Sequence, residues 1–453
     1  MRVGALGALA GALSLLLAPV AVHAQDANYW SMAFGTRARL LGGVVTGSSG
    51  DISSVYYNPG ALALTPSAEL LLAGSAYQYQ RVEVKGGSGV TRDITSSTLG
   101  AVPSLFAGEI PRDKTNRIAY SFLTRQQANL EIDFRATTGV GASSPLPNPS
   151  FAALEFQLHQ NMSENWFGLT WSRLISPALG VGISPYAVVR TQSTLVSFLS
   201  QGQNSSGQAA LLSYDRDFNF INWRLLAKIG LSGVKDSLTY GLTLTTPGVS
   251  LFGGGAVHYN TSLIDQTGSV GNIVGASYQE DLKATYKSPA GAGIGASYGW
   301  GSSRIHAAAE WFAAQSQFTV LPTASFTIST PGGDSTVTPI VTERLNSVFN
   351  FGFGLEHDFN PILAGFASYH TDRSARDVGQ EPGASITSWN LNHVTIGATL
   401  HAWRSDFAFG LTTAFGSQAA PALPARPDGK PTPTGAQVHE LITTASLGWK
   451  ITF

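Results

Sequence analysis

Hydrophobic and polar residues alternate with a period of two along most of the chain. Between residues 347 and 359 the odd positions include Phe349, Phe351 and Phe353, and the even positions between them are mostly small or polar. Successive side chains of a β-strand point to opposite faces of a sheet, so this pattern describes a strand with one apolar and one polar face. The same alternation recurs at 221–229, 237–244, 407–412 and 441–453. The sequence therefore predicts an all-β fold.

The alternation delimits fourteen strands. They are expected at about 68–85, 95–110, 117–136, 150–175, 178–198, 209–232, 237–252, 276–299, 304–320, 340–359, 362–374, 389–402, 406–417 and 437–453. Short connections such as Ser176-Pro177 follow the even-numbered strands, and long ones rich in Gly, Ser, Thr and Pro, such as 253–275, follow the odd-numbered strands. Short periplasmic turns and long external loops are typical of an outer-membrane barrel, so the sequence predicts a transmembrane antiparallel β-barrel. Proline removes a ladder donor, and we expect a bulge or kink at Ser288-Pro289.

The composition favours the membrane barrel over a soluble β-sandwich, which would also show alternation. Only 12% of the residues are charged, against roughly 25% in a typical soluble domain. A barrel whose outer wall faces lipid tolerates so few charges. The chain has no cysteine, which excludes disulfides and thiolate metal sites. Its net charge of -1 gives no basic surface for nucleic acid.

The first residues, 1–24, are predicted to be a cleaved signal peptide. Arg2 supplies a positive charge, residues 4–22 are almost continuously apolar, and cleavage is expected after Ala24. The alternative is an anchoring helix, but Pro19 interrupts the apolar stretch and no charged stop-transfer cluster follows it. No later run of roughly 18 apolar residues is long enough for a spanning helix. We therefore expect export to the outer membrane of a Gram-negative cell.

Residues 25–66 have a different composition from the strands that follow. Small residues, scattered apolar residues and a proline turn suit a compact plug of short helices and turns. A periplasmic tail is the alternative, but a segment rich in Tyr, Leu and Val is expected to bury itself, and a wide barrel offers a lumen for it. The expected organisation is a plug at 25–66 and a barrel at 67–453.

The end of the plug carries a family resemblance. The run from Gly50 to Asn58-Pro59 resembles the N-terminal hatch of the FadL-type outer-membrane transporters, whose hatch contains an Asn-Pro-Ala motif. Here the third position is Gly60, followed by Ala61. Further similar segments lie at 242–248 and 392–397, and the last strand ends in Phe453.

The resemblance implies a function as well as a fold. FadL-type proteins carry long-chain fatty acids and, in the TodX-like branch, aromatic hydrocarbons. It implies a fourteen-strand barrel, a gate at Asn58, Pro59 and Gly60, and an exit sideways through the wall into the membrane. The sequence shows no segment for an energised inner-membrane partner, so transport is expected to be passive. The expected partners are a hydrophobic small molecule and outer-membrane lipid, and a closed sheet is expected to be monomeric.

Two other functions are alternatives to this interpretation. A general porin for polar solutes would need no apolar plug, so residues 25–66 argue against it. A structural or secretion-associated barrel could use the same segment to dock a protein partner. Deletion of residues 26–60 separates these cases, because a porin would keep its conductance and a gated transporter would become leaky to ions.

The sequence contains no cofactor motif, and neither a metal site nor an enzyme is expected. His357 between Glu356 and Asp358 is the best local metal cluster, but adjacent residues of a strand point to opposite faces and cannot chelate together.

An outer-membrane hydrolase would need a catalytic group assembled from neighbouring strands. His393, His401 and Asp406 are candidates by position, but no feature singles them out. No catalytic residue is predicted, because titratable residues on a channel wall are usually solvated groups.

Two basic residues are predicted to face the lumen. The alternation places Arg224 and Lys228 inward, where they could contact a fatty carboxylate while Leu226 contacts its tail. In the alternative, they pair with acidic residues such as Glu310 or Glu356, or stabilise the plug. The pairing interpretation is favoured.

Overall fold

The computed structural model describes most of the chain after the expected signal peptide. The described residues are 27–48, 50–65, 69–85, 93–100, 103–110, 113, 115–137, 144–146, 148–268, 271–376, 383–419 and 437–453. The expected signal peptide, 1–24, lies outside them. No helix within the described residues is long and apolar enough to cross a membrane.

Seventeen strand segments form one antiparallel sheet that closes on itself, because β1 pairs with β21 as well as with β2 and β3. Three strands are each built from two segments, so the sheet is a barrel of fourteen strands, as predicted. The segments are β1 (Glu69–Lys85), β2 (Ile94–Gly100), β3 (Pro103–Ile110), β4 (Asn116–Ala136), β5 (Phe151–Ser176), β6 (Leu179–Gln203), β7 (Ala209–Lys235), β8 (Leu238–Thr245), β9 (Val249–Asp265), β10 (Ile273–Lys283), β11 (Gly291–Trp300), β12 (Ser303–Phe312), β17 (Val348–Asp358), β18 (Leu363–Asp372), β19 (Leu391–Ala402), β20 (Ser405–Ala419) and β21 (Gln437–Thr452).

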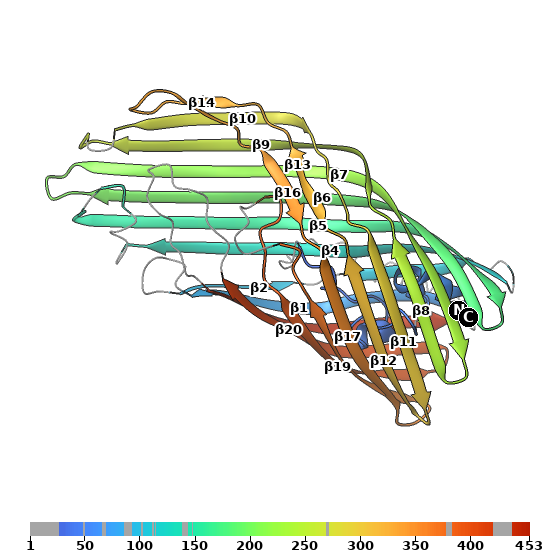
Figure 1. Ribbon diagram of the computed structural model, residues 1–453. Helices are drawn as coiled ribbons and strands as arrows, with labels where there is room; N and C mark the ends of the chain where they lie inside the picture. Colours follow the sequence, from blue (N-terminus) through green and yellow to red (C-terminus); the bar gives the residue numbers. More distant parts are fainter. Residues whose placement is uncertain are drawn as a thin grey trace, which may run out of the picture.

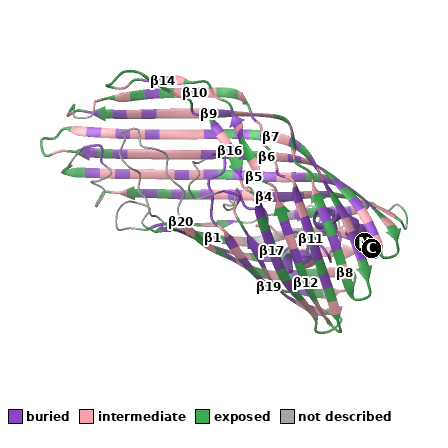
Figure 2. Ribbon diagram, viewed as in Figure 1, coloured by how far each residue is buried: buried purple, intermediate pink, exposed green. Residues whose placement is uncertain are grey.

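The outer face of the barrel is apolar. In β17 the side chains of Phe349, Phe351 and Phe353 are exposed, whereas Val348 and Asn350 are buried. Bands of exposed and buried residues alternate along the neighbouring strands in the same way (Figure 2). Exposed aromatic and aliphatic side chains on a closed wall are stable against lipid and not against water, so this face is the membrane-facing surface of an outer-membrane barrel.

The strands β4 to β7 are much longer than the strands on the other side of the barrel. They contain 21, 26, 25 and 27 residues, whereas roughly 9–11 residues cross a bilayer at a tilt. Figure 1 shows them running together well past the ends of β12 and β17. This part of the wall therefore projects beyond the membrane.

Several predicted elements differ from the structure. The strands expected at 304–320 and 340–359 each divide into a barrel strand and a short strand of a separate sheet. The loop expected at 253–275 is mostly strand, since β9 includes Gly253-Gly254-Gly255 and ends at Asp265. Glycine has no side chain, so a strand with consecutive glycines does not show the alternation of hydrophobic and polar residues. Within the next predicted strand, residues 284–290 separate β10 from β11, so the interruption expected at Ser288-Pro289 is present.

Several segments that connect the barrel strands fold inward and cover the lumen. Tyr286, between β10 and β11, is buried, as are residues of two short strands, β13 (Gln315–Leu321) and β16 (Val341–Leu345), which pair with each other. Figure 1 shows β13 and β16 running obliquely to the long strands β4 to β7. Two shorter strands, β14 (Phe326–Ile328) and β15 (Ser335–Val337), also pair.

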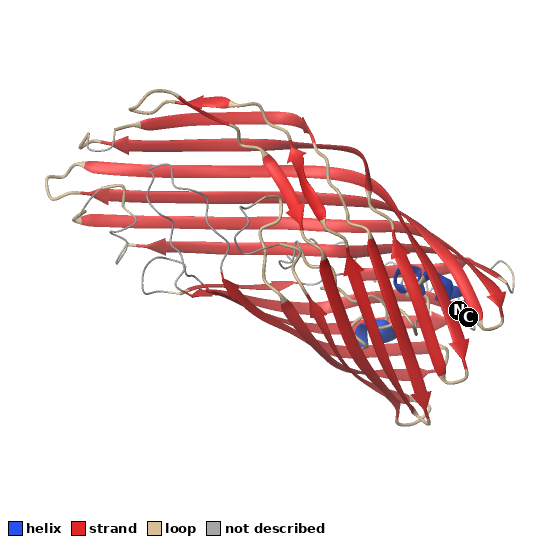
Figure 3. Cartoon of the chain, viewed as in Figure 1, coloured by secondary structure: helices blue, strands red, loops and turns tan. Residues whose placement is uncertain are grey.

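The N-terminal segment, defined here as residues 27–65, packs against the inner face of the barrel. It contains two short helices, α2 (Arg37–Leu40) and α3 (Ser54–Tyr57), and a 3₁₀ helix, η1 (Pro59–Leu64). Figure 3 shows these helices enclosed by strands. Its apolar side chains form one buried cluster with inward residues of the wall. The segment contributes Phe34, Leu41, Ile52, Val55 and Leu62, and the wall contributes Trp166, Tyr186, Val188 and Leu226.

Candidate functional site

Asn58 joins the N-terminal segment to the barrel wall. Its side chain is fully buried, and its Nδ2 donates to the carbonyl oxygens of Thr46 and Leu231, each at 2.9 Å. Its Oδ1 accepts a hydrogen bond from the backbone N–H of Gly60 at 3.1 Å, which caps η1. The amide thereby connects two parts of the segment to β7 through one side chain.

Gly60 allows the segment to lie directly on the wall. A Cβ at this position would lie 2.6 Å from the carbonyl oxygen of Gly230 in β7 and 2.7 Å from that of Gly180 in β6. Real Cβ atoms do not approach backbone this closely, so an alanine requires the segment to move. The structure therefore places Asn58, Pro59 and Gly60 together at one contact with β6 and β7.

A second polar contact lies between α2 and β17. The guanidinium of Arg37 donates to both oxygens of Glu356, from Nε at 2.9 Å and from Nη2 at 2.6 Å. His306 lies beside this pair, with Nε2 3.2 Å from the Glu356 carboxylate and Nδ1 2.7 Å from Ser48 Oγ. Because Arg37 holds Glu356 in a bidentate pair, this group serves as a contact between the segment and the wall. Arg39 in the same helix is buried, which lowers its pKa to about 10 and leaves it protonated at neutral pH.

A third contact fixes the start of the segment. Residues 27–31, called the N-terminal strap, lie against Asp372 at the end of β18. The buried Asp372 carboxylate accepts hydrogen bonds from the N–H groups of Tyr29 at 3.1 Å and Trp30 at 2.9 Å, and from Ser31 Oγ at 2.7 Å. The Nδ2 of Asn28 donates to the Asp372 carbonyl oxygen at 3.0 Å. One carboxylate therefore holds three consecutive residues of the strap.

The opposite side of the strap is held by a bulge in β4. The register with β5 shifts between Thr124 and Gln126, so Arg125 is the extra residue. Arg125 Nη2 donates to the Tyr29 carbonyl oxygen, and Gln126 Nε2 donates to that of Asn28 at 2.5 Å. Both side chains are buried. The bulge turns two consecutive side chains inward, and both bind the strap.

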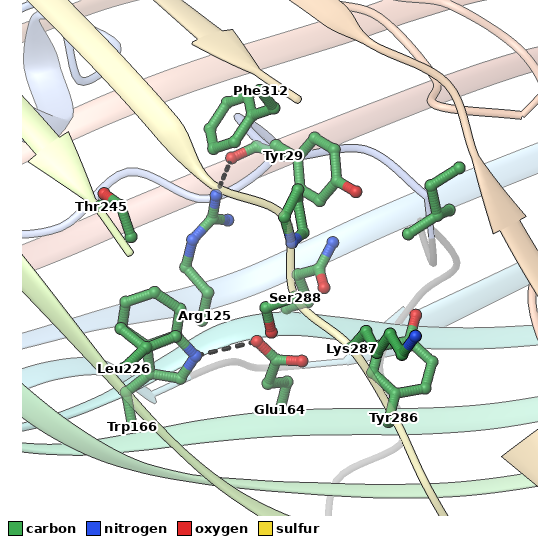
Figure 4. Close-up of a pocket in the computed structure, with 13 residues that line it drawn as sticks. Tyr29, Arg125, Glu164, Trp166, Leu226, Thr245, Tyr286, Lys287, Ser288 and Phe312 are labelled. Carbon is green, nitrogen blue, oxygen red and sulfur yellow. Dashed lines mark hydrogen bonds between the residues drawn. The ribbon is translucent and has the colours of Figure 1, made fainter. Parts of the chain in front are cut away.

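A small cavity lies between the strap and the wall. Its volume is about 40 Å³, and its lining includes Tyr29, Arg125, Glu164, Trp166 and Tyr286. Figure 4 shows Arg125 reaching the strap at Tyr29 and Glu164 accepting from Trp166. Since a single water needs roughly 10–15 Å³, this space holds a few waters and no hydrophobic solute. We use the term closed state for this arrangement, in which residues 27–65 lie against the inner face of the wall.

The inward positions predicted for Arg224 and Lys228 are confirmed by their burial, with 0% and 5% exposure, in contrast to 48% for Leu225. Arg224 forms an ion pair with Glu164, and Lys228 Nζ lies 4.0 Å from Glu310 Oε1. The sequence interpretation named Glu310 as a possible partner and did not identify Glu164, which lies on β5.

Two further residues complete this buried group. Arg190 on β6 lies 3.6 Å from Glu164, and the ring of Tyr286 contacts both guanidiniums, at 4.2 Å from Arg190 and 4.9 Å from Arg224. Sequence reasoning missed both residues, although the inward phase of Arg190 could have been read from its strand. The position of Tyr286 depends on the inward turn of residues 284–290; Ser288-Pro289 indicates an interruption there but not its inward direction.

The residues considered for a hydrolase do not assemble. His401 pairs with Asp406 across a hairpin, at 2.7 Å between Nδ1 and Oδ1. His393 lies elsewhere, with its ring stacked on His370 at 4.3 Å between ring centroids.

The residues considered for a metal site are likewise separated. Glu356 binds Arg37, whereas His357 Nδ1 contacts Ser303 Oγ at 2.8 Å. Within the described residues, the side chains with metal-ligand spacing are Glu131, Asp133 and His159, on the outer face of β4 and β5. Sequence reasoning missed this group because it spans two strands.

Between β2 and β4, the described residues of the wall form no hydrogen-bonded ladder, and this interval is called the seam. The ladder between β3 and β4 ends at Leu105 and Leu123. Beyond this point, the described residues of β2 pair with β1, and those of β4 pair with β5. The seam begins at the Arg125 bulge. The outward residues of β4 change there from Tyr120 and Phe122 to Gln127 and Asn129. The seam therefore starts where the apolar outer surface of β4 ends.

Comparison with solved structures identifies this fold. No family model and no curated protein matches the chain. The P. putida toluene transporter TodX is similar with a TM-score of 0.60 and 14% identity, covering 93% of this chain and 99% of that chain. A Pseudomonas aeruginosa FadL homologue has a TM-score of 0.55 and 12% identity, covering 94% and 100%. The Ralstonia pickettii toluene transporter TbuX also has a TM-score of 0.55 and 12% identity, covering 93% and 98%.

Identities this low establish a shared fold. The chain has the fold of the FadL-type channels, as the sequence resemblance predicted, and it is a bacterial outer-membrane barrel. Two of these structures are described as toluene transporters.

Proposed function

We propose that the chain is a passive outer-membrane channel for small hydrophobic molecules, gated by the N-terminal segment. The observation that carries this proposal is that residues 27–65 lie inside the barrel, held against the wall by separate polar contacts at Asn58, Arg37 and the strap. The segment is not a strand of the barrel sheet, so it can move without breaking the wall. Structures with the same fold are described as toluene transporters and monoaromatic hydrocarbon channels.

The seam between β2 and β4 is the proposed exit. Unpaired strand edges are not stable against lipid, so they persist only where protein or a cavity covers them. The inner face beside the seam is an apolar cluster that includes Val82, Ile94, Leu130 and Phe134. The seam starts where the apolar outer surface of β4 ends. A solute that leaves through it therefore emerges at the border of the membrane and avoids the aqueous periplasm.

The buried cations favour a ligand with an anionic head, such as a fatty carboxylate. Glu164 pairs with two arginines, Arg190 and Arg224, so one carboxylate faces two guanidiniums and cannot accept from all of their N–H groups. Arg224 Nε and Nη1 and Arg125 Nη1 have no hydrogen-bond partner within the described residues. Buried donors without acceptors are destabilising. A carboxylate at this position would accept from them while its chain occupies the apolar lumen.

Uptake measurements test the channel function. Cells lacking their own channels of this type would express the full chain, the chain without residues 26–60, or no channel. We expect the full chain to raise uptake of radiolabelled dodecanoate or toluene, with sugar permeation unchanged. The deletion should admit the sugar as well. Equal permeation of sugar through the full chain would instead indicate a porin, and uptake of neither hydrophobic solute would contradict the proposal.

Charge reversal tests the anionic head. Arg224→Glu should lower dodecanoate uptake and leave uptake of dodecanol, which has the same chain length without the charge, close to that of the unmodified protein. Unchanged dodecanoate uptake would remove Arg224 from the ligand site. Loss of both solutes would indicate a folding defect, which thermal unfolding would show.

A further inference from the structure

The bulge at Arg125 joins four parts of the molecule through one side chain. Its guanidinium donates to the strap at Tyr29 and lies over the ring of Tyr56 in α3, 5.7 Å from the centroid, and over Trp166 on β5, at 6.0 Å. The same side chain lines the cavity. Arg125 also marks the point where the seam between β2 and β4 begins.

The hydrogen bonding of Arg125 is incomplete. The side chain is 5% exposed, forms no ion pair with a described carboxylate, and has no hydrogen-bond partner for Nη1. The two guanidiniums nearby, Arg190 and Arg224, both contact Glu164. Arg125 is therefore a buried cation that holds a neutral carbonyl with one donor and leaves another donor unpaired beside the cavity.

We propose that Arg125 is the residue through which a bound anionic ligand releases the N-terminal strap; this rests on the proposed transport function. A carboxylate that enters the cavity first meets Nη1. A carboxylate accepts two parallel bonds from a guanidinium and is a stronger acceptor than a carbonyl, so it draws Nη2 away from Tyr29. The strap then keeps its bonds to Asp372 and Gln126 and loses the one to Arg125.

The release has a thermodynamic basis. A ligand shifts an equilibrium only by its difference in affinity for the two states. In the closed state the Tyr29 carbonyl occupies Nη2, so a carboxylate binds through Nη1 alone. In the released state both nitrogens are free for it. The ligand therefore binds the released state more tightly and opens the contact that blocks its own route to the seam.

A single introduced cysteine reports the position of the strap. The chain contains no cysteine, and Ala33, just beyond the strap, is half-buried. In Ala33→Cys protein reconstituted into vesicles, we expect dodecanoate to accelerate maleimide labelling by about tenfold, the effect of removing one hydrogen bond to a charged group. Dodecanol at the same concentration should leave the rate within about twofold, a change well below that of one such bond.

Substitutions at Arg125 test its role against a matched control. In the same background, Arg125→Met should label quickly without ligand and show no response to dodecanoate. Arg125→Gln replaces the cation by a shorter neutral amide, so it should also fail to respond to dodecanoate. Arg135→Met removes an exposed arginine of the same strand, which pairs with Glu155, and should behave like the parent.

The outcomes separate this inference from the proposed function. A response to dodecanoate in Arg125→Gln, or an equal response of the parent to dodecanol, overturns the role of Arg125, even if uptake of dodecanoate is normal. Absence of dodecanoate uptake in the parent contradicts the anionic substrate instead. Arg125→Gln keeps the inference testable if Arg125→Met fails to fold, which thermal unfolding of each variant checks.

Discussion

The contact of Gly60 with the wall gives a quantitative prediction for Gly60→Ala. The added Cβ would lie 2.6 Å and 2.7 Å from two carbonyl oxygens, of Gly230 and Gly180. Both atoms belong to the backbone of barrel strands and cannot swing aside as a side chain does. The N-terminal segment must therefore move by several tenths of an ångström, to reach the roughly 3.0 Å that a Cβ tolerates. This shift also strains the hydrogen bonds of Asn58.

The size of the destabilisation in Gly60→Ala follows from overpacking. Inserting a methyl group into a closely packed site destabilises it by about 1–3 kcal/mol. The strain acts on the closed position of the segment and not on the barrel sheet. The open fraction should therefore rise roughly 5- to 150-fold, at 1.4 kcal/mol for each factor of ten.

Ion conductance of single barrels in a planar bilayer measures the effect. We expect more frequent openings in Gly60→Ala than in the parent. Gly254→Ala is the matched control, because a Cβ at Gly254 meets nothing within 4 Å. Parental conductance in Gly60→Ala, together with an unchanged unfolding temperature, would refute the argument from close packing.

Three further substitutions have defined outcomes. Asp372→Asn replaces an acceptor of three strap hydrogen bonds by a group with one acceptor oxygen, and should increase conductance without changing the strand content seen by circular dichroism. Arg37→Met removes the bidentate contact with Glu356 and should destabilise the closed segment by about 1–2 kcal/mol, measured as faster proteolysis of residues 27–65. Parental proteolysis would mean that this partly exposed pair contributes little. Glu164→Gln leaves buried arginines without their counter-charge and should destabilise the protein by about 3–5 kcal/mol in thermal unfolding; a change below about 1 kcal/mol would contradict the assigned ion pair.

The strands and their inward faces could be predicted from the sequence, because the period of two is a local property of the backbone. The burial of Arg224 and the exposure of Leu225 follow the predicted alternation. Only local contacts are needed for such a prediction. The fourteen strands of the barrel were countable for the same reason. The motif at Asn58 was identifiable from a short run of residues, although its binding partner, Leu231, was not.

The tertiary structure decided which side chains meet across the lumen. Glu164 pairs with Arg224 because β5, β6 and β7 align in one register, and this register depends on every strand at once. The extra residue at Arg125 shifts the inward phase of β4 from odd to even positions, which a strict alternation cannot represent. The inward turn at Tyr286 brings its ring onto two arginines from other strands. These contacts join residues far apart in the chain, and only the closed barrel brings them within reach.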